Sequence, residues 1–186
     1  RDSVATIDRI LDQATPPHDI GRPRLAIDRV FTMTGFGTVV TGTLIEGHLS
    51  TGQEVEILPG RLRARIRGLQ THKQKLESAV PGSRVAVNLS GLATSDLGRG
   101  DVLTTPGWLR PTASLDVRLR MIRGLASPLP HNATVSFHTG SSEVAAKVRL
   151  LDTNELGAAA TGWAQVRLDR PVAVAKGDLF IIRSSR

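Results

Sequence analysis

The chain has 186 residues, a formal net charge of +7 and no cysteine. The lack of cysteine excludes disulfides, thiolate metal sites and a cysteine nucleophile, and it fits a cytoplasmic setting. The positive charge favours an anionic partner, most naturally a nucleic acid, over the alternative of a basic protein without such a partner. No apolar run is long enough to cross a bilayer and no signal peptide is visible, so no membrane partner is expected.

Residues 3–14 are predicted to form a helix, because Val4, Ile7, Leu11 and Ala14 fall on one face. The prolines at 16–17 end it, and a linker follows. A helix this short needs a surface to pack on. The chain also begins with Arg1 rather than Met, so we expect it to be a piece of a longer protein, with residues 1–22 closing a preceding domain.

Residues 24–44 predict two strands joined by a glycine turn. Apolar and β-branched residues mark both strands, and Gly35 and Gly37 provide the turn between them. The segment GFGTVVTG is not a phosphate-binding loop, because it lacks the Gly-Lys-Ser/Thr ending and leads into a strand rather than a helix. This stretch therefore starts a β-meander.

The rest of the chain also has the period of β-strands. Residues 61–67 and 84–89 alternate polar with apolar side chains, which predicts half-buried strands, and residues 70–77 read as a polar crossover between them. A joint follows at residues 104–111, then five further strands at 114–122, 133–138, 143–152, 162–168 and 179–182. We predict an all-β fold of two consecutive small β-barrels, at residues 23–106 and 107–186, after a short N-terminal helix and linker.

Residues 107–186 carry most of the positive charge, with eleven Lys and Arg against six Asp and Glu. Alternation predicts that neighbouring basic residues of one strand share a face. The candidates for RNA phosphate contacts are Arg118, Arg120, Lys147, Arg149 and Arg167. A solvated strand face is the alternative for each of them. Only six aromatic residues are present, which favours backbone and shape contacts over base stacking.

No catalytic centre is predicted for this chain. Its five histidines are scattered without the spacing of metal ligands, and no Ser-His-Asp order or carboxylate pair is found. We expect the chain alone to be no enzyme and to hold no metal or cofactor.

The ordered motifs IDRVFTMTGFGTVVTGTL, TGQEVEILP, GSRVAVNLSGL and RGDVL resemble the first β-barrel of the translational GTPases. The motifs LDVRLRMI, SSEVAAKVRLLD and GDLFIIR extend this resemblance through the second half. Within that superfamily the chain most resembles the selenocysteine-specific elongation factors. The resemblance implies barrels like domains II and III of elongation factor Tu, after a GTP-binding domain.

The resemblance also implies that Asp28, Arg29 and Arg84 line a pocket for the selenocysteyl group. A selenol is largely ionised at neutral pH, whereas a serine hydroxyl is not, so two guanidiniums would favour the selenolate. Asp28 would orient the two arginines. The alternative is a local ion pair at the barrel rim, worth about 0–1 kcal/mol if exposed. His72 is in a loop that approaches this pocket in one interpretation and is an ordinary surface histidine in the other.

The partners that the resemblance implies are selenocysteinyl-tRNA, held largely by the second barrel, and the ribosome. The preceding domain would bind GTP and Mg²⁺ and make the parent a GTPase, and a further C-terminal region would read an mRNA hairpin. Two alternatives stay open. One is another translational GTPase, similar to elongation factor Tu or an initiation factor, and the other is a β-barrel that docks a protein rather than RNA.

Overall fold

The structure is a computed structural model that describes residues 2–13, 19–125 and 127–184. Helix α1 (Asp2–Gln13) confirms the predicted N-terminal helix. Its apolar side chains Val4, Ile7 and Ile10 are exposed. The predicted helix end at Ala14 and most of the predicted linker, residues 15–18, lie outside the described residues. No helix in the described ranges is long and apolar enough to span a membrane.

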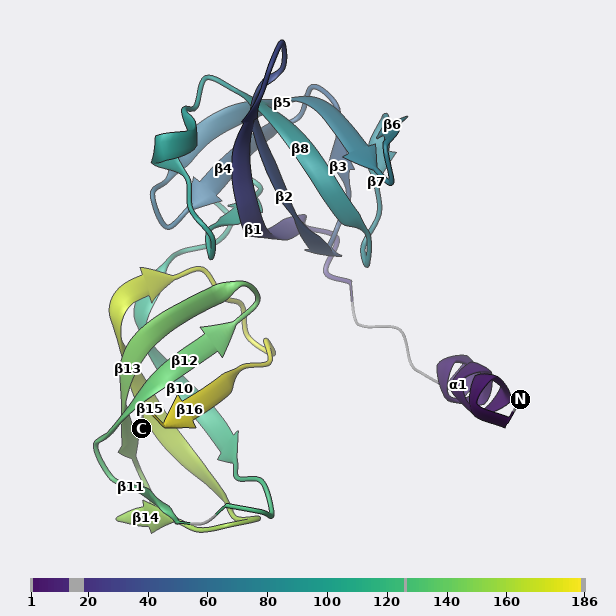
Figure 1. The fold of residues 1–186 in the computed structure, drawn as a ribbon. Helices are drawn as coiled ribbons and strands as arrows, with labels where there is room; N and C mark the ends of the chain where they lie inside the picture. The colour runs from purple at the N-terminus through teal and green to yellow at the C-terminus, as the bar shows by residue number, and fades with distance from the viewer. Residues whose placement is uncertain (1, 14–18, 126, 185–186) are drawn as a thin grey trace.

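A closed ring of six strands forms the first barrel (Figure 1). The ring order is β4-β9-β1-β2-β8-β5, and β5 pairs back with β4 to close it. Its strands are β1 (Arg24–Met33), β2 (Gly37–Glu46), β4 (Glu54–Leu58), β5 (Leu62–Thr71), β8 (Arg84–Ser90) and β9 (Val102–Thr104). The barrel also carries three short strands and one 3-10 turn. These are β3 (Leu49–Ser50), β6 (Gln74–Leu76), β7 (Ser78–Ala79) and η1 (Thr94–Asp96).

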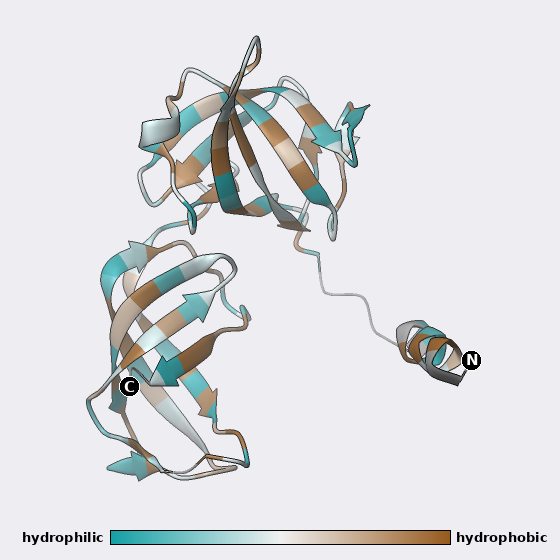
Figure 2. Ribbon diagram, viewed as in Figure 1, coloured by the Kyte–Doolittle hydropathy of each residue, from teal (hydrophilic) through white to brown (hydrophobic). Residues whose placement is uncertain are grey.

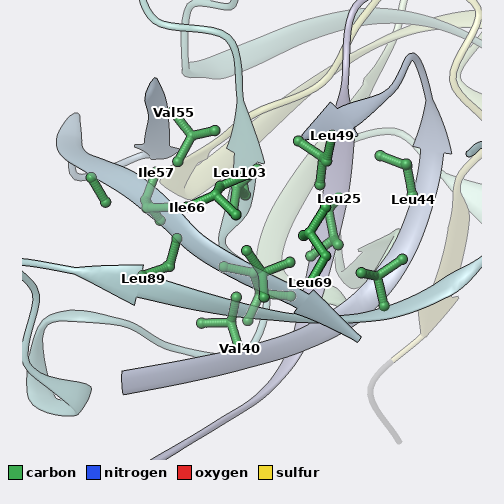
Figure 3. Packing of buried hydrophobic residues seen from close by; sticks show 14 of the residues in the cluster. Leu25, Val40, Leu44, Leu49, Val55, Ile57, Ile66, Leu69, Leu89 and Leu103 are labelled. Atoms are coloured by element: carbon green, nitrogen blue, oxygen red, sulfur yellow. The ribbon is translucent and has the colours of Figure 1, made fainter. Parts of the chain in front are cut away.

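The interior of this barrel is filled by aliphatic side chains from every strand of the ring (Figure 3). Leu25, Val40, Ile57, Val85 and Leu103 are all at most 1% exposed. Strands β5 and β8 alternate inward apolar with outward residues, which gives alternating bands in Figure 2. The predicted alternation in residues 62–67 and 84–89 is confirmed by these burial patterns.

The second unit is a five-stranded antiparallel sheet in the order β10-β15-β13-β12-β16. Its strands are β10 (Thr112–Arg120), β12 (Ala133–Thr139), β13 (Ser142–Leu150), β15 (Thr161–Val172) and β16 (Ile181–Ser184), with a small pair of β11 (Leu129–Pro130) and β14 (Glu155–Leu156). A separate core forms around Phe137, whose ring stacks on Phe180 with centroids 5.1 Å apart. The predicted all-β class is therefore confirmed, while the exact boundaries 1–22, 23–106 and 107–186 stay predictions.

The two units are joined by a buried ion cluster at the start of β1. Arg24 is 3% exposed, and its guanidinium donates to both Asp178 oxygens at 2.6 and 2.7 Å and to Glu46 at 2.7 Å. Burial opposes this charge, yet the hydrogen bonds to Asp178 and Glu46 raise the pKa of Arg24. Close by, the Ser141 hydroxyl donates to the Ile27 carbonyl at 2.6 Å. The second unit is thus fastened to β1 by side chains as well as by the chain.

The predicted polar crossover at residues 70–77 is wrong. Gln70 and Thr71 continue β5, and they pair with Lys75 and Gln74 of β6 across a hairpin turn. His72 and Lys73 form that turn with positive φ angles of 46° and 66°. The segment is polar because this hairpin projects beyond the barrel, not because it lacks strand structure.

Candidate functional site

A β-bulge in β1 places two consecutive charged residues on the outer surface of the first barrel. The β1–β2 register shifts between Ile27, which pairs with Gly42, and Arg29, which pairs with Thr41. Asp28 is the extra residue, and such a bulge re-aims a side chain that strict alternation would send inward. Ile27 and Val30 therefore pack against the core on either side of Asp28 and Arg29.

Asp28 and Arg84 form a two-pronged ion pair across the outer face. Arg84 Nη2 donates to Asp28 Oδ1 at 2.9 Å, and Nη1 makes a shorter hydrogen bond to Oδ2. The Thr41 hydroxyl donates to the same Oδ1 at 2.9 Å, so one carboxylate holds three donors. The Arg84 side chain is 52% exposed and that of Asp28 21%. The site is open to a ligand but has a fixed carboxylate at its base.

The carboxylate of Asp28 is held in its charged form by these contacts. The hydrogen bond from Arg84 lowers the pKa of Asp28 below its usual value, against the effect of burial and with further help from Thr41. The same bond raises the pKa of Arg84. The ion pair that one interpretation of the sequence placed at the barrel rim therefore exists, and both partners stay charged at neutral pH.

Arg29 differs from Arg84 in how it acts on Asp28: after the Arg84 hydrogen bond, the positive charge of Arg29 also helps to lower the pKa of Asp28, but at longer range. Its side chain is exposed, and among the described residues it forms no ion pair or side-chain hydrogen bond. The direct hydrogen bonds of Asp28 go to Arg84, and the orientation of Arg29 by Asp28 stays a prediction. The site combines one neutralised guanidinium with one whose charge is available.

His72 is near this site without touching the ion pair. The Thr71 hydroxyl donates to the Arg84 carbonyl at 2.8 Å and lies 3.2 Å from His72 Nδ1. The histidine is exposed, so both earlier interpretations apply in part: it is a surface residue, and it is in a turn that reaches the backbone of Arg84.

Asn88 is a polar residue of this face that sequence reasoning did not single out. It pairs with Val39 on one side and Gly68 on the other, and its Oδ1 is buried without a hydrogen-bond partner in the described part of the chain. Its place on the same face as Arg84 follows from alternation in β8. Nothing in the sequence indicates that its amide is covered.

Acidification is expected to remove the stabilisation from Asp28. Because its folded pKa is lowered, its contribution is fully present above the unfolded pKa of about 4 and is lost as pH falls through the folded value. An NMR titration of the Asp28 carboxyl carbon would measure this pKa, and Arg84→Ala should raise it toward about 4. An Asp28 titration that is the same in both proteins would contradict the assigned cause.

The five predicted phosphate-contact residues lie on one face of the second unit. Arg118 and Arg120 project from β10, Arg167 from the adjacent β15, and Lys147 and Arg149 from β13 beyond it. Arg167 pairs with Lys147, and all five side chains are exposed. Within the described ranges none of them forms an ion pair, although Asp116 is on the same face. We call these five residues the cationic face.

No cluster of three or more His, Cys, Asp or Glu residues that could hold a metal ion occurs among the residues described. The turn between β1 and β2, where the glycine-rich segment lies, connects two strands and offers no helix N-terminus to a phosphate.

Two family models match the chain. The model described as elongation factor Tu domain 2 matches residues 37–104, and that described as the beta-barrel domain of selenocysteine-specific elongation factor matches residues 116–186. A selenocysteine-specific elongation factor of Desulfomicrobium baculatum is 47% identical over 161 residues, which are 87% of this chain and 25% of that protein. The corresponding factor of Haemophilus influenzae is 34% identical over 163 residues, again 87% and 25%.

The chain is also similar to an elongation factor of a different name. An elongation factor 1-alpha of Pyrobaculum aerophilum is 39% identical over 119 residues, 63% of this chain and 27% of that protein. The fold and these matches define the β-barrel region of a translational elongation factor. Within that class, the chain belongs to the family of selenocysteine-specific elongation factors. It spans about a quarter of the length of the curated relatives that it matches.

Proposed function

We propose that this chain is the tRNA-binding part of a selenocysteine-specific elongation factor that carries selenocysteinyl-tRNA to the ribosome. The observation that carries the proposal is the site on the first barrel, where Arg29 lies beside the Asp28–Arg84 ion pair and makes no direct ion pair of its own among the described residues. Its three charged groups sum to one positive charge, which suits one anionic group of an aminoacyl ligand.

The chemistry distinguishes a selenolate from a hydroxyl. A selenolate brings a full negative charge toward Arg29 and the outer edge of Arg84, while a serine side chain brings only a dipole. Charge-assisted hydrogen bonds are about twice as strong as neutral ones. Asp28 disfavours an anion that approaches its own oxygens, so it also restricts where the selenolate can bind.

The cationic face supports the RNA part of the proposal. Five unpaired basic side chains on three adjacent strands fit the phosphate backbone of a tRNA, whose A-form helix is recognised mainly by backbone and shape. In this proposal the preceding domain of a longer parent binds GTP with Mg²⁺ and hydrolyses it, and a further region reads an mRNA hairpin. The place of action would be the cytoplasm.

The test compares selenocysteinyl-tRNA with seryl-tRNA on the same tRNA body, bound to the full-length protein with GTP. We expect Arg29→Ala to weaken binding of the selenocysteinyl form about ten-fold and of the seryl form much less, because only the first ligand is an anion. Arg84→Ala should show the same direction and also free Asp28 to repel the selenolate. Arg63→Ala, an exposed arginine on β5 that lies outside this site, is the matched control.

Equal losses for both aminoacyl forms would contradict the anion site and make these arginines general RNA contacts. Equal affinities of the unmodified protein for both forms would favour the second candidate, a factor for another aminoacyl-tRNA. The similarity to elongation factor 1-alpha is the observation that supports this second candidate.

A further inference from the structure

Trp163 is a large aromatic side chain on the outside of the second unit. It is 53% exposed, although its neighbour Ala164 is fully buried. Alternation along β15 therefore presents the indole outward, on the side that carries Arg167. An exposed tryptophan leaves much of a large aromatic surface in water, so its position marks a candidate binding surface.

Basic side chains outnumber acidic ones around Trp163, although Asp116 is on the same face and Asp152 accepts from the Trp163 amide. Arg118 lies directly opposite it on β10, and Arg149 on β13 pairs with Gln165, two residues further along β15. The side chains that share this outer face on β15, Thr161 and Gln165, are polar. Positive charge around one aromatic ring is suited to a nucleic acid, whereas a protein interface of this size would present more apolar side chains.

The backbone of Trp163 is held on both sides. Trp163 pairs with Arg118 of β10, and the Trp163 carbonyl accepts a hydrogen bond from the Leu151 amide at 3.0 Å. The Trp163 amide also donates to Asp152 at 3.4 Å. The backbone that carries the indole therefore loses little conformational freedom on binding.

A polar depression adjoins this position. It has a volume of about 420 Å³ and is lined by His131, Arg149 and residues 150–154. Leu151 and Asp152, which bind the Trp163 backbone, belong to its lining. The depression thus offers hydrogen-bonding groups and one guanidinium beside the indole.

We propose that Trp163 stacks on an unpaired nucleotide of the bound RNA, while Arg118 and Arg149 contact the phosphates beside it. This inference rests on the proposed tRNA binding and names a residue that specifies which RNA fits the cationic face. It adds one stacking contact to the backbone and shape contacts that the low aromatic content favours.

The test measures binding of selenocysteinyl-tRNA and seryl-tRNA to the full-length protein over a range of salt concentrations. Trp163→Ala should weaken both complexes by the same factor, roughly 5- to 100-fold, as loss of one base–aromatic stack does. The slope of log affinity against log salt should not change, because no phosphate contact is lost. Trp163→Phe should keep most of the affinity.

Two controls separate this inference from a structural effect and from the proposed function. Thr161→Ala, on the same face of β15, should leave affinity unchanged, and Arg118→Ala should reduce the salt slope by about one. Wild-type affinity in Trp163→Ala, or an affinity loss accompanied by a changed slope, would overturn the stacking. If the unmodified protein binds no tRNA in a salt-dependent way, the proposed function itself fails. In that case Trp163 belongs to a protein interface.

Discussion

Replacing Arg24 with methionine is expected to destabilise the chain by about 3 kcal/mol. Methionine keeps the bulk of the side chain but leaves Glu46 and Asp178 as unpaired carboxylates in a buried cluster. Breaking such a pair by removing one partner costs far more than the pair itself contributes, because the remaining charge is desolvated and uncompensated. Chemical denaturation of the chain would measure the free energy of unfolding.

The matched control for this prediction is Arg65→Met on β5. Arg65 forms an ion pair with Glu54 at 3.3 Å, but the two side chains are 63% and 67% exposed. Water screens that pair, so its loss should cost about 0–1 kcal/mol. Similar losses in the two variants would show that the Arg24 cluster is not fastening the units together.

Gly42→Ala is expected to destabilise the first barrel by at least about 3 kcal/mol, at the upper end of the range for overpacking. A Cβ at this position would lie 2.1 Å from the Ala26 carbonyl oxygen and 2.7 Å from Leu25 Cδ2. The oxygen belongs to the backbone of the neighbouring strand, so β1 and β2 would have to separate. Gly42 also faces Ile27 beside the bulge, and the Asp28–Arg84 geometry should be disturbed with it.

Gly68→Ala on β5 provides the comparison, since a Cβ there meets nothing within 4 Å and the residue has no positive φ. Glycine in a strand interior is less stable than alanine by roughly 0.5–1 kcal/mol, so this variant should be neutral or slightly more stable. Thermal and denaturant unfolding of the two variants measures the difference. Equal stability of both would mean that β1 and β2 can separate at little cost.

The fold could be predicted from the sequence wherever one face of a strand is buried. Leu62, Ala64 and Ile66 alternate with arginines because β5 has the barrel core on one side and water on the other. The projecting hairpin at residues 70–77 was missed for the same reason, since only Leu76 of it packs against the core and its polar sequence looks like a loop. An alternating sequence indicates directly that one face of a segment is buried. It indicates a strand only where the strand has such a buried face.

The candidate site was predictable only in part. Strict alternation would place Asp28 and Arg29 on opposite faces, and it was the resemblance to a family that grouped them. The bulge that turns both outward depends on how β1 pairs with β2, which no local pattern encodes. The ion pair of Arg24 with Asp178 could not be predicted for a related reason, because the two residues are 154 positions apart along the chain.

The first five residues of β1 connect the two halves of the molecule physically. Arg24 and Ile27 bind the second unit through Asp178 and Ser141, and Asp28 follows at once with its bond to Arg84. From Arg24 to Asp28 is four residues, about 13 Å of extended strand. The spacing between the proposed amino-acid site and the contacts to the second unit is consequently set by a β-strand and not by the length of a flexible linker.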